Sequence, residues 1–251
     1  MGLILNADDF GKSEEVNRAI AECFRRGYID RTTLMVNMPY AGEAVKLAQE
    51  EGFSDRVGIH LNLTEGMPLT RPIRKNPLFC DENGRFHAGF RQSFRNRIHM
   101  DKTSRQQIHT ELKAQLDQYK AWGFTLFHAD SHHHVHTDFP VYRVLKILAG
   151  EFSFSSIRLS RNLYHGGSVV NAVYKKWYNA SVAKLCGHCG DCFGSAADLM
   201  GYGTASENRT LCRTKQVEIM LHPMYDENGR LMDTDMPMEQ VFSYISQIHD
   251  Q

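Results

Sequence analysis

The sequence lacks a net charge. Its 251 residues include 29 Lys plus Arg and 29 Asp plus Glu, which gives a formal charge of +0 with histidine neutral. A chain without a basic excess has no long-range field that would recruit nucleic acid or an anionic membrane surface. We therefore expect no nucleic-acid partner, no membrane partner, and a small ligand that is recognised locally.

The sequence also lacks a long apolar run. Its first residues, MGLILNADDFGKSEE, have no basic flank, and their apolar part is too short for a secretory signal or a membrane span. Asn6 stands where the myristoylation pattern requires Ser or Thr. These absences lead us to expect a cytoplasmic protein whose six cysteines are reduced thiols.

No internal repeat, low-complexity tract or Pro/Gly/Ser-rich linker divides the chain, so we expect a single domain over residues 1–251. Residues 64–103 show no clear period and are expected to form a long excursion near the substrate rim. The string DENGR occurs at 81–85 and again at 226–230. Both copies predict turns, because Asn-Gly readily supplies positive φ.

Short apolar runs alternate with helical patterns along the chain. This alternation predicts parallel strands joined by right-handed crossovers. We expect the α/β class and a single-domain (β/α) barrel of TIM-like type with as many as seven strands, ahead of an open doubly wound sheet. The predicted strands are 2–7, 32–37, 56–63, 125–129, 156–160 and 217–221. One helix is predicted to begin near residue 13, and three others are predicted at 41–51, 104–123 and 139–150.

Acidic and histidine side chains follow the apolar residues of four predicted strands. Because the carboxyl ends of parallel strands converge on one face, we expect these side chains to meet in space. Two imidazoles and a carboxylate can hold a divalent metal, while a second carboxylate and a further histidine can serve as general base and general acid. The set, in chain order, is Asp8, Asp9, His60, Asp130, His132 and His222.

Each component alone has a simpler interpretation. Adjacent carboxylates after a strand often cap a helix, and a histidine within an apolar strand is often a hydrogen-bonded core residue. The run HADSHHHVHTD at 128–138 holds five of the 13 histidines and is also compatible with a weak surface metal site without catalysis. The coincidence of these groups at strand ends favours one metal site.

The histidine run cannot be one uniform set of ligands if its backbone is extended. Such a backbone would direct His132, His134 and His136 to one side and His133 to the other. We expect His132 to be the metal ligand, and His134 and His136 to contact substrate or support the ligands. His133 and His128 are expected to be packing residues.

Two other polar residues are candidates for orienting a ligand or contacting substrate. Asn62 alternates to the same side of its strand as His60. Asp130 could accept a hydrogen bond from the second nitrogen of a histidine ligand.

The segments NADDFG (6–11), GIHLNLTEGMPLT (58–70), HADSHHHVH (128–136) and LHP (221–223) occur in this order over most of the chain. Together they resemble the YdjC-like carbohydrate deacetylase family, which includes chitooligosaccharide deacetylases. The resemblance implies a (β/α) barrel, one divalent metal, and hydrolysis of an N-acetyl group on a mono- or oligosaccharide to acetate and an amino sugar.

The resemblance also implies roles for residues of this chain. The metal ligands fall on Asp9, His60 and His132, the general base on Asp8 and the general acid on His222, although the two adjacent carboxylates could exchange roles. Mg or Zn is favoured as the cofactor, and the same donors accept Mn, Co or Ni. The implied partners are a small carbohydrate substrate and a second copy of the chain in a homo-oligomer such as a dimer.

Two alternatives stay open. A metal-dependent phosphoesterase, or a hydrolase of another amide, would use the same ligands; a phosphate would require basic residues at the strand ends, which supply few. A non-catalytic histidine-rich metal-binding protein would bind several equivalent metals at 128–138 and would need neither Asp8, Asp9 nor His222.

Cys186, Cys189 and Cys192 have C-x2-C-x2-C spacing, which is not part of the family resemblance. Together with His188 or Cys212 they could hold a structural zinc or an iron–sulfur cluster. A second zinc knuckle is absent from the sequence, so reduced thiols are the favoured interpretation.

Overall fold

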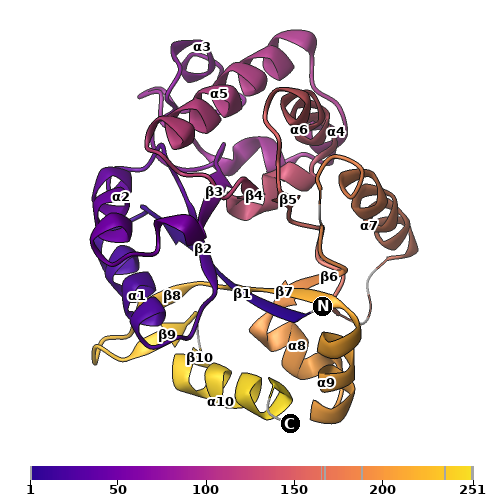
Figure 1. Cartoon of the computed structure of the whole chain (residues 1–251). Helices are drawn as coiled ribbons and strands as arrows, with labels where there is room; N and C mark the ends of the chain where they lie inside the picture. Colours follow the sequence, from indigo (N-terminus) through magenta and orange to yellow (C-terminus); the bar gives the residue numbers. More distant parts are fainter. Residues whose placement is uncertain (1, 165, 167, 188, 235, 250–251) are drawn as a thin grey trace.

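The computed structural model describes residues 2–164, 166, 168–187, 189–234 and 236–249. A curled sheet of seven parallel strands lies at its centre, with the order β5-β4-β3-β2-β1-β7-β6 (Figure 1). The strands are β1 (Gly2–Phe10), β2 (Arg31–Leu34), β3 (Val57–Leu61), β4 (His128–Ser131), β5 (Ser156–Ile157), β6 (Cys192–Ser195) and β7 (Gln216–Leu221).

The strand order is that of a barrel opened at one seam. Neighbours follow the chain from β1 to β5, and β7 returns to pair with β1, as in a closed ring. Within the part of the chain that the structure describes, β5 and β6 do not pair; instead the Asn162 and Leu163 backbone N–H groups both donate to the Phe193 carbonyl at 3.0 Å. The predicted α/β fold with a barrel-like arrangement of seven strands is confirmed.

Helices cover the outer face of the sheet (Figure 1). The first, α1, begins where the sequence predicts, because Ser13 Oγ accepts a hydrogen bond from the Val16 N–H at 3.2 Å. Its buried face contains Ile20, Cys23 and Phe24. The long helices are α1 (Glu14–Arg25), α2 (Ala41–Glu50), α5 (Lys102–Ala121), α6 (Phe139–Glu151), α7 (Val169–Val182), α8 (Ala196–Tyr202), α9 (Ala205–Thr214) and α10 (Met238–His249).

The excursion at 64–103 contains short helical segments, of which α3 (Arg71–Arg74) lies against α5 and α4 (Phe94–Ile98) lies against α6. Among the residues described, no helix is long and apolar enough to cross a membrane. The short helical segments within the described ranges are α3 (Arg71–Arg74), α4 (Phe94–Ile98) and the 3-10 segments η1 (Ser54–Arg56), η2 (Ala88–Gln92) and η3 (His132–Thr137).

Both DENGR strings are turns, as predicted. In the first, Asp81 Oδ1 accepts hydrogen bonds from the N–H groups two and four residues later, both at 2.9 Å, and Asp226 Oδ1 does the same at 2.9 and 2.8 Å. The positive φ falls on Gly84 and Gly229, both at 73°. Glycine has no Cβ and adopts this conformation without steric cost.

The chain after β7 forms a small antiparallel sheet, whose strands were not predicted from the sequence, and the closing helix α10, which contains the helical pattern EQVFSYISQI. Its strands are β8 (Pro223–Tyr225), β9 (Leu231–Asp233) and β10 (Met236–Pro237). His222 lies between β7 and β8, and its N–H donates to Asp233 Oδ1 at 2.7 Å. The hairpin therefore returns a carboxylate to the carboxyl end of β7.

Candidate metal and catalytic site

Asp9, His60 and His132 meet at the carboxyl ends of β1, β3 and β4. Asp9 Oδ1 lies 2.8 Å from His132 Nδ1 and 3.2 Å from His60 Nε2. The three ligand atoms lie within 4.8 Å of one another, and all three residues are buried. The structure thus brings together the three residues that the sequence predicts as metal ligands.

The local backbone at Asp9 is unusual and redirects its side chain. Its φ of 69° is in the left-handed region, and the pairing of β1 with β2 changes register between Ala7 and Phe10. Aspartate tolerates this region better than most residues, and such conformations concentrate at functional sites. The irregularity lets Asp9 face the two imidazoles while Asp8 lies against another partner.

The donor set fits a divalent cation. Among the described residues, Asp9 Oδ1 is buried without a well-directed hydrogen bond, although two imidazole nitrogens face it. Burial alone would raise the pKa of Asp9, but His132 and His60 outweigh it and hold the pKa far below its ordinary value. An ionised carboxylate oxygen and two imidazole nitrogens converging on one point are the ligands of mixed N/O metal sites.

Asp130 fixes the orientation of His60. Its Oδ1 lies 2.7 Å from His60 Nδ1, and Thr33 Oγ1 donates to its Oδ2 at 3.0 Å. Burial lowers the pKa of His60, but the negative charge of Asp130 outweighs this effect and raises it to about 10 in the absence of a metal. With Nδ1 donating to Asp130, Nε2 is the nitrogen directed at Asp9.

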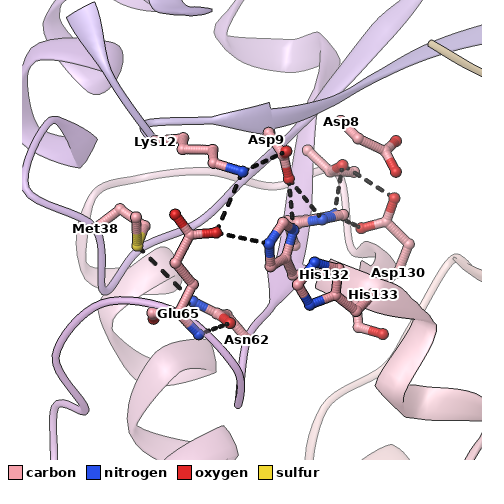
Figure 2. Close-up of polar contacts among 12 residues, drawn as sticks. Asp8, Asp9, Lys12, Met38, Asn62, Glu65, Asp130, His132 and His133 are labelled. Carbon is pink, nitrogen blue, oxygen red and sulfur yellow. Dashed lines mark hydrogen bonds and ion pairs between the residues drawn. The ribbon is translucent and has the colours of Figure 1, made fainter. Parts of the chain in front are cut away.

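Glu65 contacts the second ring nitrogen of His132 as Asp130 contacts that of His60, and Lys12 lies between the carboxylates of Glu65 and Asp9 (Figure 2). Glu65 Oε2 lies 2.9 Å from His132 Nε2, while Lys12 Nζ lies 3.2 Å from both Glu65 Oε2 and Asp9 Oδ2. The sequence reasoning missed both residues. Glu65 belongs to the quoted segment GIHLNLTEGMPLT and Lys12 follows NADDFG, but neither pattern fixes where a loop side chain points.

Asp8 is held by Arg158 rather than by the imidazoles. Arg158 Nη1 and Nη2 donate to its two oxygens at 2.6 and 2.7 Å, and Asn6 Nδ2 donates to Oδ1 at 2.8 Å. Burial opposes ionisation of Asp8, but the charge and hydrogen bonds of Arg158 dominate and hold its pKa well below the ordinary value. Asp8 is therefore an ionised carboxylate within the buried site.

Arg158 contacts two further carboxylates. Its Nη1 lies 2.8 Å from Asp130 Oδ2, and its Nε donates to Glu218 Oε1 at 2.6 Å. Arg158 is 1% exposed, so all its charge is compensated inside the protein. Arg158 therefore links Asp8 to the Asp130–His60 pair.

His222 is half-buried and lies near Asp8 and Asp233. A positive charge on His222 lowers the pKa of both carboxyl groups, although burial keeps the pKa of Asp233 above its ordinary value. The structure thus places His222 on the same side of the sheet as Asp8, at the end of β7. Asp233 was missed because the predicted turn at 226–230 does not by itself show that strands flank it or that the second strand returns to His222.

The expectation of an extended histidine run is wrong. Residues 132–137 form a 3-10 segment in which His133 and His134 have φ values of 52° and 54°. Side chains therefore do not alternate in direction. The His133 ring lies 4.0 Å from the His132 ring, and its Nδ1 contacts Thr64 Oγ1 at 3.1 Å.

The other histidines of the run have separate buried partners. The His134 ring lies 5.6 Å from the Phe193 ring, and His136 Nδ1 contacts Ser131 Oγ. His128 Nδ1 contacts Ser156 Oγ at 2.7 Å. Burial lowers the pKa of His134 to about 3 and that of His128 and His136 well below 6.5. All three are neutral imidazoles at physiological pH.

Asn62 shapes the turn that carries Glu65. Its Nδ2 donates to Asn37 Oδ1 at 3.0 Å and to the Glu65 carbonyl at 2.7 Å, and its Oδ1 accepts from the Thr64 and Glu65 N–H groups. The residue is completely buried. Asn62 therefore holds the loop that places Glu65 beside His132.

The expectation of reduced thiols is wrong for one pair. Cys186 and Cys189 form a disulfide, whereas Cys192 and Cys212 are free. Within the described ranges, no group of three metal-binding side chains includes a cysteine. His188, the other suggested member of a cysteine metal site, lies outside the described residues.

A curled parallel sheet with a buried carboxylate–imidazole cluster at its carboxyl end places the protein among the barrel-like α/β proteins with a candidate metal centre. The family model described as YdjC-like protein matches residues 2–247. The chain belongs to the YdjC-like family.

Several relatives carry the name carbohydrate deacetylase. The chain is 33% identical over 244 residues to that of Geobacillus stearothermophilus, covering 97% of this chain and 84% of the relative. It is 41% identical over 152 residues to that of Brevibacillus brevis (61% and 57%) and 41% identical over 135 residues to that of Thermoanaerobacter pseudethanolicus (53% and 50%). The matched region spans only about half the length of the latter two.

A solved structure from Enterococcus faecalis V583, described as a candidate cellobiose-phosphate cleavage protein, has the same fold. The TM-score is 0.72 at 23% identity, and the match covers 98% of this chain and 94% of the other. At this level of identity, the likeness supports the fold alone.

Proposed function

We propose that the protein is a metal-dependent carbohydrate deacetylase. It would hydrolyse the N-acetyl group of an acetylated mono- or oligosaccharide, such as a chitooligosaccharide, and release acetate and an amino sugar. The observation that carries this proposal is the convergence of Asp9, His60 and His132 beside a second, ionised carboxylate. The names of the relatives support a carbohydrate substrate.

Asp9, His60 and His132 would hold the cation, for which Mg or Zn is favoured among the metals such donors accept. When bound, a divalent cation supplies Lewis acidity toward the acetyl carbonyl and lowers the pKa of a water molecule. With a cation bound, hydrogen bonds to Asp130 and Glu65 would hold the two neutral imidazoles in the tautomers that present Nε2 of His60 and Nδ1 of His132.

Asp8 is the proposed general base and His222 the proposed general acid. Asp8 would take a proton from the attacking water while the oxygen of that water forms a bond to the acetyl carbon. The C–N bond then breaks, and His222 would give a proton to the departing amine. The assignment of Asp8 rather than Asp9 as base is supported by their partners, because only Asp9 has an oxygen facing two imidazoles.

The charges near the site favour an amide over a phosphate ester. A phosphoesterase would need cations free to meet the phosphate. Lys12 is paired with Asp9 and Glu65, and Arg158 with three buried carboxylates. The histidines of the run at 128–138 each contact different residues. This arrangement argues against a non-catalytic protein that binds several equivalent metals there.

The test is acetate release from N-acetylglucosamine and chitooligosaccharides of increasing length. The chelated protein is supplied with Mg, Zn, Mn, Co or Ni, and His109→Ala, on the outer helix α5, serves as a matched histidine control. We expect acetate release with at least one metal from the parent and the control. Absence of release from every N-acetyl sugar with every metal would reject the proposal.

A further inference from the structure

Lys12 and Glu65 form an ion pair at the mouth of the buried cluster, here called the mouth pair. Lys12 Nζ lies 3.2 Å from Glu65 Oε2 (Figure 2). Their side chains are 30% and 38% exposed, whereas those of His60 and His132 are 2% and 5% exposed. The two residues come from loops after β1 and β3, so the pair connects two sides of the site.

The mouth pair gives the two oxygens of Asp9 different partners. Oδ1 faces His60 and His132, whereas Oδ2 faces Lys12 Nζ at 3.2 Å. The Lys12 ammonium group at Asp9 Oδ2 would compete with a metal cation for that oxygen. Asp9 would therefore offer a cation one oxygen rather than two.

The mouth pair also gives Glu65 a defined task. Its Oε2 lies 2.9 Å from His132 Nε2, which parallels the contact of Asp130 with His60. Lys12 touches the same oxygen and neutralises its charge. Without Lys12, Glu65 would be a half-exposed carboxylate beside the cluster, free to become a further ligand.

We propose that Lys12 and Glu65 are positioning residues that limit the number of protein ligands in the cluster. Glu65 holds His132 in its ligating orientation, and Lys12 keeps Asp9 Oδ2 and Glu65 out of the ligand set. Room then remains for a water molecule and the substrate carbonyl. This inference rests on the proposed metal site, and it predicts opposite effects for the two residues.

The test is titration of the chelated protein with Co²⁺, whose visible absorption reports coordination number. Glu65→Leu is expected to weaken Co²⁺ binding by about 10–100-fold, the usual effect of losing a carboxylate behind a histidine ligand. Lys12→Met is expected to bind Co²⁺ at least as tightly as the parent, with a changed absorption spectrum and reduced acetate release. Lys12→Arg should restore the parent spectrum.

The matched control is Lys46→Met, which breaks an exposed lysine–glutamate pair with Glu50 on α2. Equal melting temperatures of all variants would exclude misfolding as the cause of an effect. If Lys12→Met and Glu65→Leu both bind Co²⁺ like the control, with its spectrum, while His60→Ala does not bind, the inference is wrong and the metal site stands. If the parent binds no Co²⁺, the proposed metal site itself fails.

Discussion

Arg158 donates through Nη1 and Nη2 to both carboxylate oxygens of Asp8, at 2.6 and 2.7 Å, across 150 residues of sequence. A two-point contact with a planar guanidinium fixes the carboxylate in position as well as in charge. Because Arg158 also contacts Asp130, the proposed base and the orientation of His60 depend on the same buried cation.

Replacement of Arg158 should be strongly destabilising. Arg158→Met would leave the buried carboxylates of Asp8 and Asp130 without this cation, whereas Glu218 would keep its ion pair with Arg31. Breaking a buried pair costs about 3–5 kcal/mol. Urea unfolding measures the loss. Arg25→Met, which removes an arginine from the more exposed pair with Glu51, should change stability by no more than about 1 kcal/mol. Similar losses for both variants would contradict the buried network.

Replacement of a ligand should remove metal and activity together. His132→Ala deletes a nitrogen that faces Asp9, whereas His109→Ala deletes an imidazole on α5 that is paired with an outer carboxylate, Glu151. We expect His109→Ala to retain the parent metal content and acetate release and His132→Ala to lose both. Full activity of His132→Ala after chelation would show that the assignment is wrong.

Replacement of Asp8 should separate catalysis from metal binding. Asp8→Asn keeps the shape of the side chain but removes the proton acceptor, and general-base catalysis typically contributes about 10²–10⁴-fold. We expect a loss of acetate release in that range with unchanged metal content. Loss of the metal from a variant with the parent melting temperature would contradict the separation of a base, Asp8, from a ligand, Asp9.

The buried neutral histidines should make the protein less stable in mild acid. Burial holds the pKa of His128 well below 6.5 in the folded state, whereas an unfolded chain protonates near 6.5. As the pH falls below about 6.5, the unfolded state binds the additional proton, and each such histidine lowers the free energy of unfolding by up to about 1.4 kcal/mol per pH unit. The pKa of His60 is raised in the metal-free folded state. Its contribution to the free energy of unfolding is therefore already fully present below pH 6.5 and adds nothing to the slope.

Urea unfolding of metal-free protein between pH 6.5 and 5 measures this slope. His128→Asn keeps a polar side chain beside Ser156 but cannot take up a proton. The slope of this variant should therefore be smaller by up to about 1.4 kcal/mol per pH unit. His109→Asn serves as the surface control. If His128→Asn shows the same slope as the parent protein, the pKa of His128 is not lowered in the folded protein.

Strand ends could be located from the sequence because parallel β-structure leaves a strong local pattern. Asp9, His60 and His132 each follow a short apolar run, and the convergence of such runs at one face follows from topology alone. The contacts of Arg158 and Glu65 could not be found in this way. Each depends on how a long side chain reaches across the site from another strand or from a loop, which no periodic pattern specifies.

The errors also have physical causes. Alternation within the histidine run assumed extended backbone, but positive φ at His133 and His134 breaks the period of two. The strand β6 has the sequence CFGS, too short and too poor in β-branched residues to be recognised. The Cys186–Cys189 disulfide was missed because the expected cytoplasmic location favoured thiols.

The most direct measurement of the central claim is acetate release from a chitooligosaccharide as metal is added stepwise to the chelated protein. Asp9, His60 and His132 are the proposed ligands of one metal ion, so acetate release should rise in proportion to added metal up to one per chain and then level off. Acetate release that is independent of metal, or absent at every metal content, would contradict the proposed metal-dependent deacetylase.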